Sequence, residues 1–166
     1  GKGFAVVADE IRDLEDGIEG TKTRISKLKE EILEGEKFIA QRKIDADNSK
    51  AAIERYKEQQ ANVKNNREYV SISREIEFQE MELKLAQKRI TEKNAYISEL
   101  KAQVDANNKD LKQREADLEA KRKESLSITE ETEKEEAQLK EEIAKLKGEL
   151  DARTLAAYEK VRENTN

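Results

Sequence analysis

The sequence predicts an all-α protein, a long antiparallel coiled-coil hairpin with arms of unequal length. Charged residues make up 43% of the 166 residues and aromatic residues only 4%, whereas a typical globular domain has about 25% charged residues. A compact core is therefore hard to assemble. The chain has no Pro and six Gly, so the usual breakers of long helices are nearly absent. Its apolar residues recur at alternating spacings of three and four, which is typical of a coiled coil.

The first predicted helix covers residues 4–61. Steps of three and four residues through the segment 11–63 meet an apolar residue at 11 of 16 positions, where the composition alone would give about six. The same phase extends backward to Val7 and Phe4. Gly17 and Gly20 lie inside this helix. Either they mark a kink, or the helix tolerates them at a cost of about 1 kcal/mol each relative to Ala.

A turn is predicted at residues 62–67 and a second helix at residues 68–163. The turn contains three Asn residues within five positions, and their short amides compete for backbone groups and tolerate left-handed conformations. A second apolar stripe follows through the segment 69–128, with 12 of 18 positions apolar. If the two stripes face each other, residue n of the first arm pairs with about residue 131 minus n.

This pairing leaves the chain beyond about Thr129 without a partner in the hairpin. After Ile128 the stripe changes phase, which is typical of a stutter, and it continues at Leu139, Ile143, Leu146 and Leu150. The overhang therefore needs another chain or a segment not contained in this one. A parallel dimer of one continuous helix satisfies the heptads almost as well, and only the Asn-rich break argues against it.

Several positions of the stripes are polar. Polar residues at such positions weaken a coiled-coil seam but fix its register and its choice of partner, so we expect register or tolerance, with contacts to another molecule as the alternative. They are Thr21, Arg42, Gln60, Gln79, Lys93, Asn107, Arg114 and Lys121.

The composition argues against site chemistry, so we expect no enzyme and no cofactor. The absence of His and Cys excludes imidazole acid–base work, disulfides and the common zinc sites. Carboxylates on an exposed coiled coil titrate normally and make poor catalytic groups. A net charge of −5, with its acidic excess in the segment 130–151, disfavours nucleic acid as a partner of this chain alone. We expect no membrane span and a cytoplasmic location.

The N-terminal segment 1–14 reads GKGFAVVADEIRDL. It resembles the segment that follows the hairpin tip of methyl-accepting chemotaxis proteins, and the specific part of the match is GFAVVADE. In that family this region binds the coupling protein and the histidine kinase. The resemblance implies a protein-contact role for Phe4, Val6, Val7 and Glu10.

Residues 13–166 are similar to the coiled-coil region of the bacterial C4 zinc-ribbon family of the Bacteroidetes type. The similarity is carried by DLEDGIEGTKTRISKLKEEI at 13–32, NVKNNREYVSISREIEFQEMEL at 62–83 and AAYEKVREN at 156–164. It implies a helical hairpin followed by a four-cysteine ribbon, in proteins that are linked to nucleic acids, sigma factors or secretion. Since this chain has no Cys, we expect no zinc in it.

We therefore expect a non-enzymatic scaffold that presents helix surfaces to a protein partner, with self-association through the overhang as one form of partnership. Two alternatives are a chemotaxis signalling fragment and a nucleic-acid or sigma-factor adaptor that requires the ribbon. The candidate contact residues near the turn and the phase shift are large side chains, for which core packing is the competing role. They are Tyr56, Tyr69, Phe78, Met81 and Tyr158.

Overall fold

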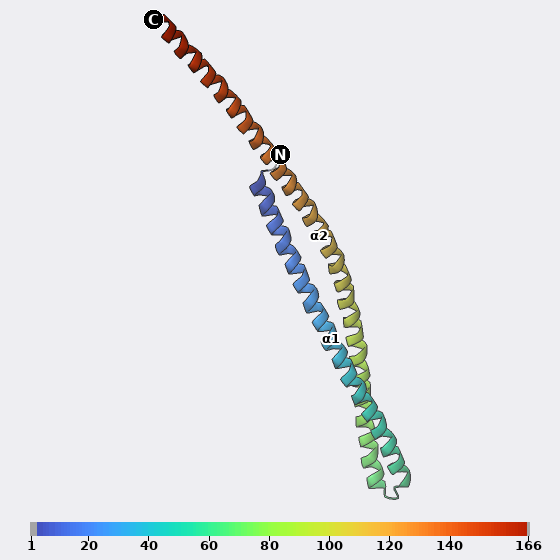
Figure 1. The fold of residues 1–166 in the computed structure, drawn as a ribbon. Helices are drawn as coiled ribbons and strands as arrows, with labels where there is room; N and C mark the ends of the chain where they lie inside the picture. Colours follow the sequence, from blue (N-terminus) through green and yellow to red (C-terminus); the bar gives the residue numbers. More distant parts are fainter. Residues whose placement is uncertain (1–2, 166) are drawn as a thin grey trace. The chain divides into compact units, whose positions relative to one another are not determined.

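The computed structural model describes residues 3–165 and confirms the all-α hairpin. Helix α1 covers Phe4–Asn62 and helix α2 covers Asn66–Thr165, and a short loop joins them (Figure 1). The helices divide into two compact units. We call residues 18–113 the turn unit, and residues 3–17 with 114–165 the terminal unit.

The loop between the helices is shorter than the predicted turn, because Asn65 caps α2. Its side-chain Oδ1 accepts a hydrogen bond from the backbone N of Arg67 at 2.8 Å, and its carbonyl accepts one from the N of Tyr69 at 3.0 Å. The first bond satisfies a donor that the helix start would otherwise leave unpaired. The carboxylate of Glu68 in the first turn of α2 has a favourable interaction with the helix dipole. Thus Asn66 is already helical, and α1 extends to Asn62.

The Asn residues of the turn do not adopt the left-handed conformations that they tolerate, because no residue in the described part of the chain has a positive φ angle. Asn62 instead donates from Nδ2 to the carbonyl O of Glu58 at 3.2 Å, so it extends the hydrogen bonding of α1. The amides in the turn therefore act as helix caps rather than as left-handed hinges.

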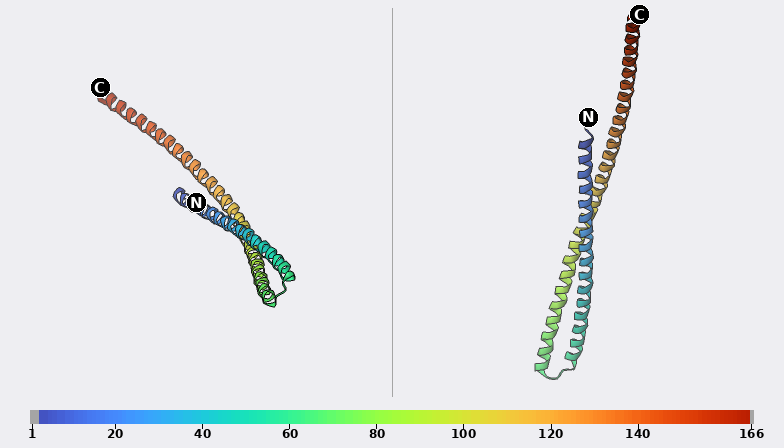
Figure 2. Two further views of the ribbon diagram at one scale, coloured as in Figure 1. Left: turned by 90° about the horizontal axis from the view of Figure 1, so that it is seen from below. Right: turned by 60° about the vertical axis from the view of Figure 1, so that its left-hand side comes forward.

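In the turn unit the two helices lie side by side in antiparallel orientation, as both views of Figure 2 show. The cation–π contact of Lys93 with Phe38 and the hydrogen bond from Arg24 to Asn107 join residues whose numbers add up to 131, as predicted. The core of the unit is a cluster of stripe residues, and Ile32 and Leu111 pack against it. The buried members are Ile25, Leu28, Leu100 and Val104.

The terminal unit continues the same register. Lys121 forms an ion pair with Glu10 at 2.6 Å, and the side chain of Arg114 lies against Gly17. Val7 is fully buried. In both units almost every stripe position up to Ile128 is buried or half-buried, with Phe4 and Tyr69 as the exceptions, so the predicted phase of both stripes is confirmed.

The glycines do not interrupt α1, which is continuous through Gly17 and Gly20. Gly17 instead makes room for Arg114, because a Cβ at this position would lie 2.5 Å from Nη1 of that side chain. A Cβ added at Gly20 would have no atom within 4 Å. This agrees with the interpretation that the helix simply tolerates this glycine.

Candidate protein-interaction surface

The most extensive uncovered apolar surface follows α2 in the terminal unit. Residues 130–165 are all exposed, and Figure 1 shows α2 continuing past the N-terminal end of α1. Along this segment, large apolar side chains are 57–66% exposed, and the first four of them keep the coiled-coil steps of four, three and four residues. They are Leu139, Ile143, Leu146, Leu150, Leu155, Tyr158 and Val161. Apolar stripes of this kind normally pack against another helix.

The physical contrast with the covered part of α2 is sharp. Ile97 and Leu100 occupy the same kind of stripe position in the turn unit and are only 6% and 3% exposed. The two parts of the stripe therefore have similar residue types, but only the first part is buried against α1. We call the exposed part, from Thr132 to Val161, the uncovered stripe.

A second, smaller apolar patch lies on the outer side of α2 in the turn unit. Phe78 is 55% exposed, Met81 is 71% exposed and Leu85 is 40% exposed, and their spacing of three and four residues places them on one helix face. The core-packing role considered for Phe78 and Met81 was wrong. Both lie off the stripe that faces α1, whereas the neighbouring stripe residue Ile76 is 9% exposed.

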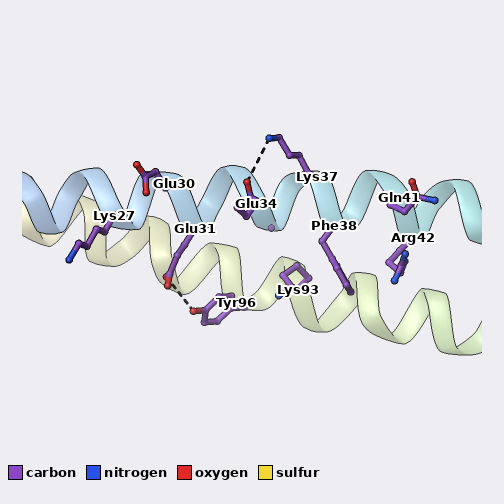
Figure 3. A pocket seen from close by; sticks show the side chains of 11 residues that line it. Lys27, Glu30, Glu31, Glu34, Lys37, Phe38, Gln41, Arg42, Lys93 and Tyr96 are labelled. Carbon is purple, nitrogen blue, oxygen red and sulfur yellow. Dashed lines mark hydrogen bonds and ion pairs between the residues drawn. The ribbon is translucent and has the colours of Figure 1, made fainter.

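A groove lies in the turn unit between α1 and α2 and is lined by mixed charges around Phe38 (Figure 3). The guanidinium carbon of Arg42 lies 4.9 Å from the centre of the Phe38 ring, and Nζ of Lys93 lies 5.0 Å from it. The cations therefore stack on the ring faces. Nε of Arg42 also forms an ion pair with Asp45 at 2.8 Å.

At the other end of this groove the phenol of Tyr96 donates a hydrogen bond to Oε2 of Glu31 at 3.4 Å. The negative charge of Glu31 raises the pKa of Tyr96, with smaller contributions from desolvation and from Glu99. The ion pairs beside the groove, Arg42–Asp45 and Lys37–Glu34, lie within α1. The contacts that join α2 to α1 here are those of Lys93 with Phe38 and of Tyr96 with Glu31.

Among residues 3–165 no cluster of three or more His, Cys, Asp or Glu side chains has the geometry to hold a metal ion. Within the same part of the chain, neither helix contains a stretch apolar enough to cross a bilayer.

No protein-family model, curated protein or solved structure matches the chain. The candidate surfaces are therefore judged on geometry and chemistry.

The residues singled out by the chemoreceptor resemblance divide into two pairs. Val7 and Glu10 belong to the seam of the terminal unit, where Glu10 pairs with Lys121. Phe4 and Val6 are 56% and 50% exposed. The segment thus offers only part of the implied contact surface to solvent; residues 1–2 lie outside the described part of the chain.

The remaining candidates do not gather at one site. Tyr56 is half-buried in the turn unit, and the guanidinium carbon of Arg55 lies 5.9 Å from its ring centre. Tyr69 is exposed beside the loop, where its carbonyl accepts a hydrogen bond from Gln60 at 3.3 Å. Tyr158 is exposed in the terminal unit, on the part of α2 that also carries the uncovered stripe.

Sequence reasoning found the phase-shifted stripe but did not select its residues as contact residues. Leu139, Ile143, Leu146 and Leu150 carry a 4-3-4 spacing, and that spacing was the available signal. Leu85 was also missed, because it lies one position from the predicted stripe.

Proposed function

We propose that the chain is a non-enzymatic coiled-coil scaffold, the hairpin part of a zinc-ribbon protein, which presents helix surface to a protein partner. The observation that carries the proposal is the uncovered stripe, in which four apolar residues from Leu139 to Leu150 keep coiled-coil spacing and are 57–65% exposed. Burying such side chains against a helix stabilises a complex by about 1.5–3 kcal/mol each before ordering costs are subtracted.

The hairpin supports this proposal because it holds one end of α2 against α1. In the terminal unit the Glu10–Lys121 pair joins α1 to the part of α2 that precedes the uncovered stripe. Presenting a stripe on a preformed helix lowers the entropy lost when a partner binds. The family part of the proposal rests on the similarity of segments 13–32, 62–83 and 156–164. The proposal takes the cytoplasm as the compartment.

Site-specific photo-crosslinking in the cell of origin tests the proposal. A photoreactive residue at Ile143, on the uncovered stripe, should form a discrete adduct with a protein. The matched control is Leu33, which is 55% exposed on α1 and lies off the stripe; it should form none. The absence of a discrete adduct from position 143, or equal adducts from both positions, would contradict the proposal.

A second candidate function is a chemotaxis signalling contact, favoured by the exposure of Phe4 and Val6 at the end of α1. Under this proposal the double variant Phe4→Glu with Val6→Glu abolishes binding to the coupling protein, while the variant keeps its seam because Val7 and Glu10 are unchanged. Binding that is absent before substitution, or unchanged after it, would sink this candidate.

A further inference from the structure

Together with the half-buried Ile128, the uncovered stripe has a spacing that reads the same from both ends. From Ile128 to Val161 the successive steps are 4, 4, 3, 4, 3, 4, 3, 4 and 4 residues. A stripe with this symmetry is self-complementary when two copies pair in antiparallel orientation about a twofold axis. Each residue would then face a residue of the second copy, and the two residue numbers would add up to 289.

The residues that would face each other are chemically matched. The four inner positions pair Leu139 with Leu150 and Ile143 with Leu146, so four central layers are fully apolar. Ile128 would face Val161, and Thr132 would face Ala157.

The remaining layers carry opposite charges. Glu136 would face Arg153 of the second copy, and Arg153 would face its Glu136. Both side chains are exposed, and among the described residues neither has an ion-pair partner. In a parallel, in-register pair these two layers would instead bring Glu136 against Glu136 and Arg153 against Arg153.

In the terminal unit α1 lies on the α2 stripe up to its first turn, where Val7 is fully buried and Glu10 pairs with Lys121. In the antiparallel pair, Val161 of the second copy would lie near Ile128.

From these observations we propose that the uncovered stripe binds the same stripe of a second copy of this chain in antiparallel orientation. The proposal rests on the scaffold function and names its partner. The charges on either side of the stripe disfavour this orientation, because antiparallel pairing brings Lys140 near Lys147 of the second copy and Glu142 near its Glu149. These positions stay in contact with water, where like charges interact weakly and salt screens them, whereas the layers between the helices exclude water.

Charge exchange in the full chain tests the orientation by sedimentation equilibrium. Glu136→Arg and Arg153→Glu should each weaken the dimer at least about tenfold, since each places like charges in two layers. The double variant should return to within about threefold of the unchanged chain. The controls are Glu141→Arg and Lys145→Glu, which make the same charge changes away from the stripe and should have little effect.

Lys147→Glu gives a second, independent readout of orientation. In the antiparallel pair this substitution replaces the repulsion between Lys140 and Lys147 of the two copies with an attraction, and it should lower the dissociation constant of the dimer. In a parallel pair the same variant would place the new carboxylate near Glu142 of the second copy and weaken the dimer. Weakening by Lys147→Glu, or no rescue in the charge-exchange double variant, would overturn the antiparallel assignment.

The lack of native Cys allows a direct geometric check. A mixture of the Thr132→Cys and Ala157→Cys chains should form a disulfide, whereas each chain alone should not. In the antiparallel pair, positions 132 of the two copies lie about 37 Å apart. Disulfides within each single variant would mean a parallel pair and overturn the proposal.

A purified chain that stays monomeric at all accessible concentrations would also overturn self-pairing. That outcome is distinct from failure of the scaffold function, because position 143 would then still crosslink to a different protein. Helical circular dichroism of each variant verifies folding, which the exposed substitution sites should leave unchanged.

Discussion

Ile97 of α2 packs directly against the backbone of α1 at Gly35. A Cβ added to Gly35 would lie 2.9 Å from Cδ1 and 3.0 Å from Cγ1 of Ile97, and Ile97 is only 6% exposed. The glycine thus has a packing role in the turn unit. It allows a β-branched side chain of one helix to fill the space at the surface of the other.

We predict that Gly35→Ala lowers the melting temperature although alanine favours helix by about 1 kcal/mol. Overpacking against a buried side chain typically costs about 1–3 kcal/mol. Gly20→Ala is the matched control, since nothing lies within 4 Å of its added Cβ, and it should raise the melting temperature. In the Ile97→Val background, which removes Cδ1, Gly35→Ala should cost less. Equal stabilisation by both glycine substitutions would show that Ile97 yields without cost.

The ion pair between Glu10 and Lys121 provides a second prediction, on the seam of the terminal unit. Both side chains are less than a third exposed, so Glu10→Gln should destabilise the chain by about 1–2 kcal/mol. Asp9→Asn makes the same charge change in the exposed pair with Arg12, where the atoms are 3.8 Å apart, and should cost less than about 0.5 kcal/mol. Urea unfolding followed by circular dichroism measures both. Similar losses for the two variants would exclude a special role for the Glu10–Lys121 pair.

The third prediction separates the seam from the outer patch of α2. Ile76→Ala should cost about 2–5 kcal/mol, because Ile76 is 9% exposed and faces α1. Phe78→Ala and Met81→Ala should each change stability by less than about 0.5 kcal/mol, because these side chains are mainly exposed. Thermal melts of the three variants check the contrast. A large loss from Phe78→Ala would mean that this ring packs on the hairpin in solution.

The fourth prediction concerns Tyr96, whose pKa is raised chiefly by the negative charge of Glu31. A raised pKa means that the folded state holds the phenol proton more tightly than the unfolded state. The resulting stability is complete below about pH 10, the ordinary pKa of tyrosine, and is lost as the pH rises through the higher pKa of folded Tyr96. Glu31→Gln should lower this pKa.

Ultraviolet titration of the phenolate band measures that shift, and the Tyr96→Phe variant assigns the band. Glu30→Gln, one residue away on α1, is the charge-matched control and should move the Tyr96 titration less. If the two glutamate variants shift it equally, a general field rather than the Glu31 contact sets the pKa.

Much of the fold follows from the sequence because heptad spacing is a local signal. The stripe phases of both helices, the pairing of residue n with residue 131 minus n, and the change of phase after Ile128 could all be derived from residue positions. The roles of individual polar residues could not. Whether Asn65 forms a left-handed turn or a helix cap depends on a bond between its side chain and the backbone of Arg67, and composition does not specify that geometry.

The candidate surface was only partly predictable for a related reason. Spacing identifies a stripe, but the same spacing is found in Leu100, which is buried by α1, and in Leu146, which is 65% exposed. The exposure of Leu146 follows from the pairing of residue n with residue 131 minus n, which leaves the chain beyond about Thr129 without a partner in the hairpin. The aromatic character of Phe78 suggested a core or contact role. Its exposure follows from its position on a face of α2 that does not point toward α1.

The sequence by itself determined that the chain is helical, where it turns, and in which register its arms pair, because backbone propensity and apolar periodicity act over a few residues. The tertiary structure decided the contacts of individual side chains. The full burial of Val7, the close approach of Ile97 to Gly35 and the contact of Arg114 with Gly17 depend on atoms brought together from distant parts of the chain.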